Sequence, residues 1–322
     1  METTMNRVTT LGNQGLTVPS IGLGCMGMSD FYGRPEDSAN LKVLDRALEL
    51  GCNFWDTADM YGPFINEELV GKALKGRREK VTLATKFGVK RGEDGSFLGL
   101  SGTPEYVRDC CEASLKRLGT DHIDLYYQHR MDPDVPIEDT VGAMGELVAE
   151  GKVRYIGLCE VGPDILERAH KVHPLSALQT EYSLWSREIE DDILPALRRL
   201  GIGFVAYSPL GRGFLTGAIK SREDLAPDDW RLTQPRFAPD AFEANLDLVR
   251  RVEDLAANKN VEPGQLALAW VLAQGDDIAT IPGTTRIANL ERNLAAGDIT
   301  LTPEDLDSLN ALPHQDIVGG RY

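Results

Sequence analysis

Four polar residues of complementary chemistry follow three successive apolar runs in the first half of the chain: Asp56, Tyr61, Lys86 and His129. A phenol has a reference pKa of about 10 and is a poor acid by itself. A nearby lysine ammonium lowers the pKa of a phenol, and an aspartate beside that lysine keeps it charged and oriented. A histidine can hydrogen-bond the oxygen that receives the proton. Together these groups could protonate a carbonyl oxygen while a hydride arrives, and the set contains no obvious nucleophile.

Eight apolar runs of strand length recur along the chain, with helical patterns between them. Several are almost continuous in apolar or β-branched residues, as expected for parallel strands that are covered on both faces. Eight such alternations without a break in composition predict one (β/α)₈ TIM barrel domain over residues 1–322, with a doubly wound sheet as the alternative. The predicted strands are 21–26, 53–57, 81–86, 123–128, 153–158, 175–180, 203–208 and 278–283.

Amphipathic patterns predict helices at 36–50, 103–118, 164–172, 189–200 and 286–296. Thr103 is the expected N-cap of the second helix, because Pro104 suits the first helical position. Two segments depart from the alternation. Residues 7–18 predict a β-hairpin before the first barrel strand, and residues 209–240 form a long loop, rich in Pro and Gly, after the seventh strand. Loops of this length in a compact domain are usually functional or mobile.

The predicted barrel explains how residues far apart in the sequence could form one site. Active sites of such barrels lie at the carboxyl ends of the strands. Neighbouring strands lie about 4.8 Å apart, so side chains at the ends of the second, third and fourth strands can converge. An isolated Asp–Lys pair across two strands is most often structural. Four candidate residues at three successive strand ends favour a functional site instead.

Composition limits the class of protein. The 322 residues carry a net charge of -16, which argues against a nucleic-acid partner because such a surface needs a basic stripe. Five cysteines, two of them adjacent, make a poor disulfide framework, and METTMNRVTT lacks the apolar core of a signal peptide. The longest apolar run, 266–273, is too short to span a bilayer. We therefore expect a cytoplasmic protein with no membrane partner.

Six stretches between about residue 20 and residue 293 carry a family resemblance. They read, in order, DTADMYG, ATKFG, YYQHR, LQTEYSLWSR, AYSPLGRGFLTG and IPGTTRIANLERN. Together they resemble successive signatures of the aldo-keto reductase superfamily, and the chain is most similar to its perakine-reductase-like group of bacteria and plants. The resemblance implies an NADP-dependent oxidoreductase of the alcohol dehydrogenase or carbonyl reductase type. Such an enzyme reduces a small-molecule aldehyde or ketone to an alcohol with NADPH and uses no metal.

The same resemblance implies a role for individual residues. The four residues named first are the catalytic tetrad, in which Tyr61 donates the proton, Lys86 lowers its pKa and His129 orients the substrate carbonyl. Gln179 would hold the nicotinamide carboxamide, and Tyr207 would stack on the nicotinamide ring. The other implied cofactor positions are Cys25, Met26, Cys159, Glu160, Ser208, Leu210, Gly211, Gly283, Thr284, Thr285, Arg286, Asn289 and Asn293.

Two of these positions bear on cofactor choice and affinity. Arg286 is the candidate for a 2′-phosphate, because a guanidinium matches a phosphate fork, and this favours NADP(H) over NAD(H). Cys159 and Glu160 stand where many members have Ser-Asn and the closer group often has Ser-Glu. A thiol is a weak hydrogen-bonding group, so Cys159 would loosen one hold on the carboxamide. The alternative for Cys159 is a small buried residue that only packs.

The segment GLGCMG at 22–27 fits the dinucleotide pattern G-x-G-x-x-G. In a Rossmann fold this pattern would open a helix directly. Here MSDFYGRPED intervenes and no helical pattern begins before about Glu36, so the Rossmann interpretation is disfavoured. We expect instead that these glycines let the first strand end pass close to the nicotinamide.

Other residues are weaker candidates for a substrate pocket or a metal site. Arg130, Trp185, Arg212 and Trp230 could line the substrate pocket or its lid, or simply pack the rim. His170 and His173 lie three residues apart without the cysteine or carboxylate cluster that zinc requires.

Two rivals belong to other functional classes. One is an NADP(H)-sensing regulatory subunit with little turnover, against which the intact tetrad argues. The other is a barrel hydrolase or isomerase, for which only Glu160 and Glu181 remain as spare acids at the rim. The sequence predicts no particular oligomeric state.

Overall fold

Each of the eight predicted strand segments overlaps one strand of a single parallel sheet in the computed structural model, which describes residues 7–32, 36–92, 94–314 and 317–321. Hydrogen-bonded neighbours run in the order β12-β11-β10-β9-β8-β5-β4-β3. The strands are β3 (Leu23–Gly24), β4 (Phe54–Asp56), β5 (Thr82–Phe87), β8 (Ile123–Gln128), β9 (Val153–Cys159), β10 (Ala177–Glu181), β11 (Gly203–Tyr207) and β12 (Ile278–Thr280).

The sheet closes where its first strand meets its last. Ile21 pairs with Thr280, and Gly24 pairs with Gly283, both in parallel bridges. A Cβ on Gly24 would lie 2.7 Å from the carbonyl oxygen of Ile281, so this glycine permits the close approach of the two strand ends. The predicted (β/α)₈ barrel is therefore confirmed, and the second glycine of GLGCMG has a role in closing it.

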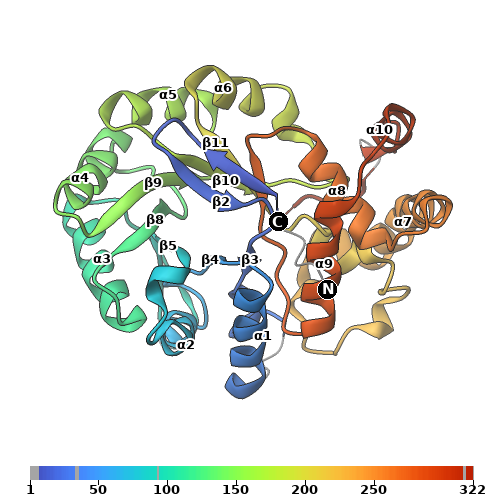
Figure 1. The fold of residues 1–322 in the computed structure, drawn as a ribbon, viewed down its shortest axis with the longest axis horizontal. Helices are drawn as coiled ribbons and strands as arrows, with labels where there is room; N and C mark the ends of the chain where they lie inside the picture. Colours follow the sequence, from blue (N-terminus) through green and yellow to red (C-terminus); the bar gives the residue numbers. More distant parts are fainter. Residues whose placement is uncertain (1–6, 33–35, 93, 315–316, 322) are drawn as a thin grey trace.

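Helices alternate with the strands and form the outer ring of the barrel (Figure 1). As predicted, the Thr103 hydroxyl accepts a hydrogen bond from the Tyr106 N–H at 3.3 Å, and Pro104 occupies the first position of α3. GLGCMG opens no α-helix, since α1 begins only at Asp37. The helices are α1 (Asp37–Glu49), α2 (Ile65–Leu74), α3 (Pro104–Leu118), α4 (Ile137–Ala149), α5 (Pro163–Val172), α6 (Ile193–Leu200), α7 (Pro239–Lys259), α8 (Pro263–Ala273), α9 (Ile287–Ala295) and α10 (Pro303–Asn310).

The longest apolar run, 266–273, lies in α8. From Leu266 to Leu272 this helix is buried, so it reads as apolar on every face because it packs on every face. Within the ranges that the structure describes, no helix has the length and apolar character needed to cross a membrane.

The predicted N-terminal hairpin consists of β1 (Val8–Leu11) and β2 (Leu16–Pro19), and it lies across one end of the barrel (Figure 1). Leu11, Leu16 and Val18 belong to one buried apolar cluster with barrel-interior side chains such as Phe54 and Leu125. This packing seals the amino-terminal end of the barrel and leaves the carboxyl end available for a site.

Two segments shape that carboxyl end. The predicted loop at 209–240 contains short 3₁₀ turns at Gly211–Thr216, Arg222–Asp224, Trp230–Thr233 and Pro235–Phe237. A second hairpin, β6 (Val89–Arg91) with β7 (Phe97–Leu100), follows β5 and was not predicted. Its strands have only three and four residues, too few for a clear alternating pattern.

Candidate active site

The register of the barrel brings the four candidate residues to one end. Asp56 is the last residue of β4, Lys86 lies next to the end of β5, and His129 directly follows β8. These three strands are neighbours in the sheet. Tyr61 lies in the loop between β4 and α2. The four residues therefore meet at the carboxyl end of the barrel, opposite the hairpin that seals the other end.

Lys86 is the centre of the cluster. Its Nζ donates hydrogen bonds to Asp56 Oδ1 at 2.5 Å, to the Thr57 carbonyl at 2.8 Å and to the Tyr61 hydroxyl at 3.3 Å. The lysine side chain is 0% exposed and that of Asp56 is 3% exposed. A buried ammonium is stable only when its donors are satisfied and a counter-charge is close. The three contacts supply both conditions and fix the Nζ beside the phenol.

Hydrogen bonds to the loop after β3 fix the loop that carries Tyr61. Gly62 has φ +65°, and a Cβ there would lie 2.6 Å from the Ile65 side chain, so the turn after Tyr61 requires glycine. The Gly62 N–H donates to Asp30 Oδ2 at 2.9 Å. Asn66, in the first turn of α2, donates to the Cys25 carbonyl at 2.9 Å. The loops after β3 and β4 are thereby joined, and the tyrosine is fixed in place.

Burial and charge act in opposite directions on the Tyr61 phenol. Burial raises the pKa of Tyr61, the Lys86 ammonium lowers it, the Asp56 carboxylate raises it, and the net result is a pKa of about 12. The expected direction of the lysine effect is present, but the expectation of a lowered tyrosine pKa is corrected. Removal from water outweighs the ammonium, so Tyr61 keeps its proton through the neutral range.

His129 completes the cluster as a neutral imidazole. Its ring meets the Tyr61 ring edge to face, with centroids 5.7 Å apart. Burial, together with the positive charges of Lys86 and Arg130, holds the pKa of His129 well below its ordinary value. A neutral imidazole can donate one hydrogen bond and accept another. Beside the phenol, it can orient an oxygen without bringing a third positive charge into the site.

Gln179 joins the cluster from the opposite side of the barrel. Its Nε2 donates to Asp56 Oδ2 at 2.8 Å, while Lys86 occupies the other oxygen of that carboxylate. Gln179 lies opposite Cys159 in the pairing of β10 with β9, and both line the same cavity. Gln179, the predicted partner of the nicotinamide carboxamide, is therefore also a hydrogen-bond donor to the buried Asp56 carboxylate.

A cavity of about 910 Å³ opens above this cluster. Asp56, Tyr61 and His129 line it, whereas Lys86 lies buried behind them. The predicted cofactor residues in its wall are Met26, Cys159, Gln179, Tyr207, Ser208, Leu210, Gly283, Thr284, Thr285, Arg286, Asn289 and Asn293. The predicted substrate-pocket residues in its wall are Arg130, Arg212 and Trp230. Predicted residues from well-separated parts of the sequence thus share one cavity.

The other predicted cofactor and substrate residues, Cys25, Glu160, Trp185 and Gly211, are not among the described residues that line the cavity. Cys25 is buried, with its Sγ 3.7 Å from the Leu23 carbonyl. Trp185 is buried as well, and its ring stacks on Phe214 with centroids 5.0 Å apart. Gly211, at φ +56°, lies against this indole, and a Cβ there would be 2.6 Å from it. Trp185 is therefore a packing residue beneath the loop at 209–240, and its proposed place in the substrate pocket is corrected.

The two spare acids at the rim are already paired. Glu160 is held by Arg321 at 2.9 Å and does not line the cavity within the described part of the chain. The Glu181 carboxylate forms two ion pairs. Its Oε2 lies 3.2 Å from Arg212 Nη2, and its Oε1 lies 3.3 Å from Arg236 Nη1. A hydrolase that uses two carboxylates would need acids that can reach the substrate. Because both spare acids are engaged in ion pairs, the structure does not favour the alternative of a barrel hydrolase or isomerase.

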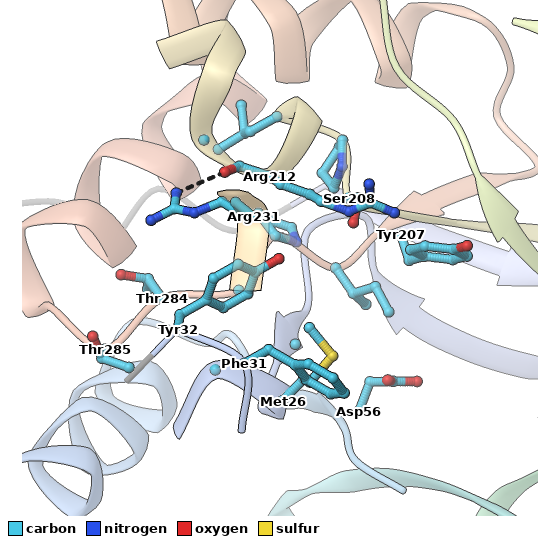
Figure 2. Close-up of a pocket in the computed structure, with 18 of the residues that line it drawn as sticks. Met26, Phe31, Tyr32, Asp56, Tyr207, Ser208, Arg212, Arg231, Thr284 and Thr285 are labelled. Carbon is cyan, nitrogen blue, oxygen red and sulfur yellow. Dashed lines mark hydrogen bonds between the residues drawn. The ribbon is translucent and has the colours of Figure 1, made fainter. Parts of the chain in front are cut away.

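Sequence reasoning missed two aromatic residues that extend the cavity wall, Phe31 and Tyr32. Phe31 meets Trp230 edge to face at 5.2 Å, and the Arg231 guanidinium lies 5.1 Å from the Tyr32 ring centroid. Arg231 also donates to the Arg212 carbonyl at 2.9 Å (Figure 2). These contacts join the loop after β3 to the loop after β11. The aromatic pair within MSDFYGRPED was the available signal.

The second hairpin contributes an apolar wall. Val89, Phe97 and Leu100 line the cavity from β6 and β7, and Met60 and Ile219 line it from neighbouring loops. Phe97 remains 67% exposed. Ligand pockets typically combine such apolar walls with a few well-placed polar groups. The arrangement therefore suits a small organic molecule whose reactive oxygen reaches Tyr61 and His129.

Comparisons with known proteins show which proteins this chain is similar to. A sequence model described as Aldo/keto reductase family matches residues 20–313. A protein from Glycine max named probable aldo-keto reductase 1 is 50% identical over 317 residues, which cover 97% of this chain and 90% of that protein.

Solved structures agree with the fold. A glycerol dehydrogenase from Gluconobacter oxydans superposes with a TM-score of 0.88 at 27% identity, covering 98% of this chain and 97% of the other. An aldo/keto reductase from Klebsiella pneumoniae, solved in complex with NADP and acetate, has a TM-score of 0.76 at 28% identity, covering 96% and 95%.

The buried Lys86–Asp56 pair yields a stability prediction. Asp56→Asn leaves the ammonium buried without its counter-charge, and should lower the free energy of unfolding by about 3–5 kcal/mol. The double variant Asp56→Asn/Lys86→Met removes both charges and should lose less than the single variant. Urea unfolding of the three proteins measures the difference. A double variant less stable than Asp56→Asn would contradict this view of the pair.

Proposed function

Because the chain belongs to the aldo/keto reductase family, we propose that it reduces aldehydes or ketones to alcohols with NADPH, as an enzyme of the carbonyl reductase or alcohol dehydrogenase type. The observation that carries the proposal is the buried contact of Lys86 with both Asp56 and Tyr61, beside His129 and at the base of a large cavity. When bound, NADPH supplies the hydride.

Tyr61 provides the proton. With a pKa of about 12, its phenol is protonated at neutral pH and is available as a general acid. As the phenol gives its proton to the substrate oxygen, negative charge grows on the tyrosine oxygen, 3.3 Å from the Lys86 ammonium. The ammonium is already in position and shielded from water, so it stabilises this charge without reorganisation. Asp56 keeps the ammonium charged and aimed.

His129 places the substrate oxygen. The imidazole is neutral, lines the cavity and lies edge to face with the Tyr61 ring. A hydrogen bond from this ring to the carbonyl oxygen would hold that oxygen near the phenol. Proximity of this kind is worth a large share of the barrier in well-oriented reactions.

The residues of the cavity wall fit NADP(H). A volume of about 910 Å³ lies near the upper end of the range for small-molecule sites, roughly 300–1,000 Å³. Gln179 and Tyr207 would hold the nicotinamide end, and the segment 283–293 the adenosine end. NADP in the Klebsiella pneumoniae relative supports this choice of cofactor.

Arg286 is better suited than Arg292 to a 2′-phosphate. Both line the cavity, but Arg292 is engaged by Glu262 at 3.2 Å and by Asn289 at 3.3 Å. For Arg286, no carboxylate partner occurs among the described residues. An uncommitted guanidinium can present its fork to a phosphate without breaking an existing pair.

Replacing Tyr61 tests the assignment of the acid. Tyr61→Phe should lower kcat for carbonyl reduction by a factor on the order of 10²–10⁴, because the proton donor is removed. The dissociation constant for NADPH should stay close to that of the wild type. Steady-state NADPH oxidation and fluorescence titration give the two quantities.

Tyr182→Phe is the matched control for this variant. It removes a phenol hydroxyl that is bonded to Glu190 at 2.7 Å, away from the cavity wall, and should leave kcat unchanged. Near-normal turnover by Tyr61→Phe on a panel of aromatic aldehydes, aliphatic aldehydes, dicarbonyls and ketones would refute the proposed mechanism.

Replacing Arg286 tests the cofactor choice. Arg286→Gln should raise the dissociation constant for NADPH by about 10- to 100-fold, the effect of losing a charged hydrogen-bond partner. The dissociation constant for NADH should change little, because NADH lacks the 2′-phosphate. Parallel titrations with both cofactors measure the ratio. An equal loss of both would show that Arg286 does not contact the phosphate.

A further inference from the structure

The last described segment of the chain returns to the rim of the barrel. Val318 exchanges two hydrogen bonds with the Asn245 side chain of α7, at 2.9 and 3.0 Å. The Gly319 carbonyl accepts a hydrogen bond from Arg236 Nε at 3.4 Å. These contacts fix the backbone on which Arg321 is carried and direct it toward the carboxyl ends of the strands.

Arg321 ends this segment in a two-pronged ion pair. Its Nη2 donates to Glu160 Oε2 at 2.9 Å, and its Nη1 donates to Glu160 Oε1 at 3.2 Å. The side chains are 29% and 12% exposed. Glu160 directly follows β9 in the left-handed region, with φ +54°, a conformation that a residue other than glycine adopts only when its surroundings hold it. Bidentate pairs of this kind give geometric precision as well as attraction.

Glu160, held by Arg321, also contacts a residue of the cavity wall. Its Oε1 also accepts a hydrogen bond from the Tyr207 hydroxyl at 2.7 Å and from the Glu181 N–H at 3.1 Å. Tyr207 lines the cavity, whereas neither Arg321 nor Glu160 does within the described ranges. Arg321 therefore contacts the carboxylate of Glu160, and the same carboxylate contacts the hydroxyl of Tyr207.

A second contact ties the same residue to another part of the wall. The Arg321 carbonyl accepts a hydrogen bond from Arg212 Nη1 at 3.1 Å. Arg212 lines the cavity, pairs with Glu181 at 3.2 Å and lies 5.3 Å from the Trp230 ring centroid. The Arg321 side chain is therefore connected to Tyr207 through Glu160, and the Arg321 carbonyl contacts Arg212 directly.

We propose that Arg321 is a positioning residue for cofactor binding, which acts through Glu160 to fix the plane of the Tyr207 ring. The inference rests on the proposed function, in which this ring stacks on the nicotinamide. A phenol ring is free to tilt about its side-chain bonds. Anchoring its oxygen to a carboxylate that is itself held by a guanidinium removes that freedom before the cofactor arrives, which strengthens binding.

Two substitutions break the proposed path at different points. Arg321→Met removes the guanidinium and keeps the apolar stem, while Tyr207→Phe removes the hydroxyl and keeps the ring. Each should raise the dissociation constant for NADPH by about three- to tenfold, the range expected for one hydrogen bond. Arg321→Lys retains the positive charge and should recover part of the loss.

The double variant Arg321→Met/Tyr207→Phe distinguishes positioning from general stability. If both residues act along one path, the double variant should bind NADPH no more weakly than the weaker single variant. Arg168→Met is the matched control. It removes a comparable two-pronged pair with Glu138, at 2.7 Å on both prongs between α5 and α4, and should leave the dissociation constant unchanged.

Fluorescence titration with NADPH, together with thermal unfolding of each variant, decides the matter. Multiplicative losses in the double variant, or an unchanged dissociation constant in Arg321→Met, would overturn the role of Arg321 and leave the proposed function intact. A wild-type protein that does not bind NADPH would overturn the proposed function and the inference together. If Arg321→Met fails to fold, Arg321→Lys against Tyr207→Phe applies the same test.

Discussion

A lysine ammonium enclosed at the end of a barrel strand is the constraint on which the rest of the site depends. Lys86 has no exposed surface, so its charge must be balanced by Asp56 and its remaining donors by Thr57 and Tyr61. Removing any partner would leave a buried polar group unsatisfied. The same contacts that stabilise the ammonium also place it beside the phenol. Stability and chemistry therefore require one arrangement.

The barrel supplies the precision that this arrangement needs. Parallel strands in fixed register bring Asp56, Lys86 and His129 to one rim, and closure at Gly24 completes the ring. The hairpin β1–β2 seals one end, so ligand access is confined to the other. Loops then add the variable parts: the aromatic contacts around Trp230 on one side and the apolar hairpin β6–β7 on another. Strand ends position Asp56, Lys86 and His129, while loops carry Tyr61 and shape the cavity.

Features that depend on local periodicity could be predicted from the sequence. The eight strands, the first hairpin and the capped start of α3 follow from patterns within a few residues. The four clustered residues followed from their common place at strand ends. Features set by distant contacts could not be predicted in this way. Glu160 and Arg321 are 161 positions apart, and only the folded chain shows that they pair.

The same limit applies to burial. The sequence indicates that Lys86 should lower the pKa of Tyr61, but the larger effect of removing the phenol from water becomes visible only in the fold. Trp185 and Cys25 belong to segments with functional neighbours, yet packing places them behind the wall. Which side of a strand or loop faces the cavity is a tertiary property, and a motif alone does not specify it.

The central claim is that the charge of Lys86 lowers the pKa of Tyr61 against the larger opposing effect of burial. It is tested most directly by the pH dependence of alcohol oxidation, the reverse of the proposed reaction, in which the proposed acid Tyr61 would act as the phenolate base. The Lys86 ammonium lowers the pKa of Tyr61 more than the Asp56 carboxylate raises it, so removing both charges should raise that pKa. The alkaline rise in kcat for Asp56→Asn/Lys86→Met should therefore shift to higher pH than in the wild type. Superimposable profiles, or a shift to lower pH, would contradict the account.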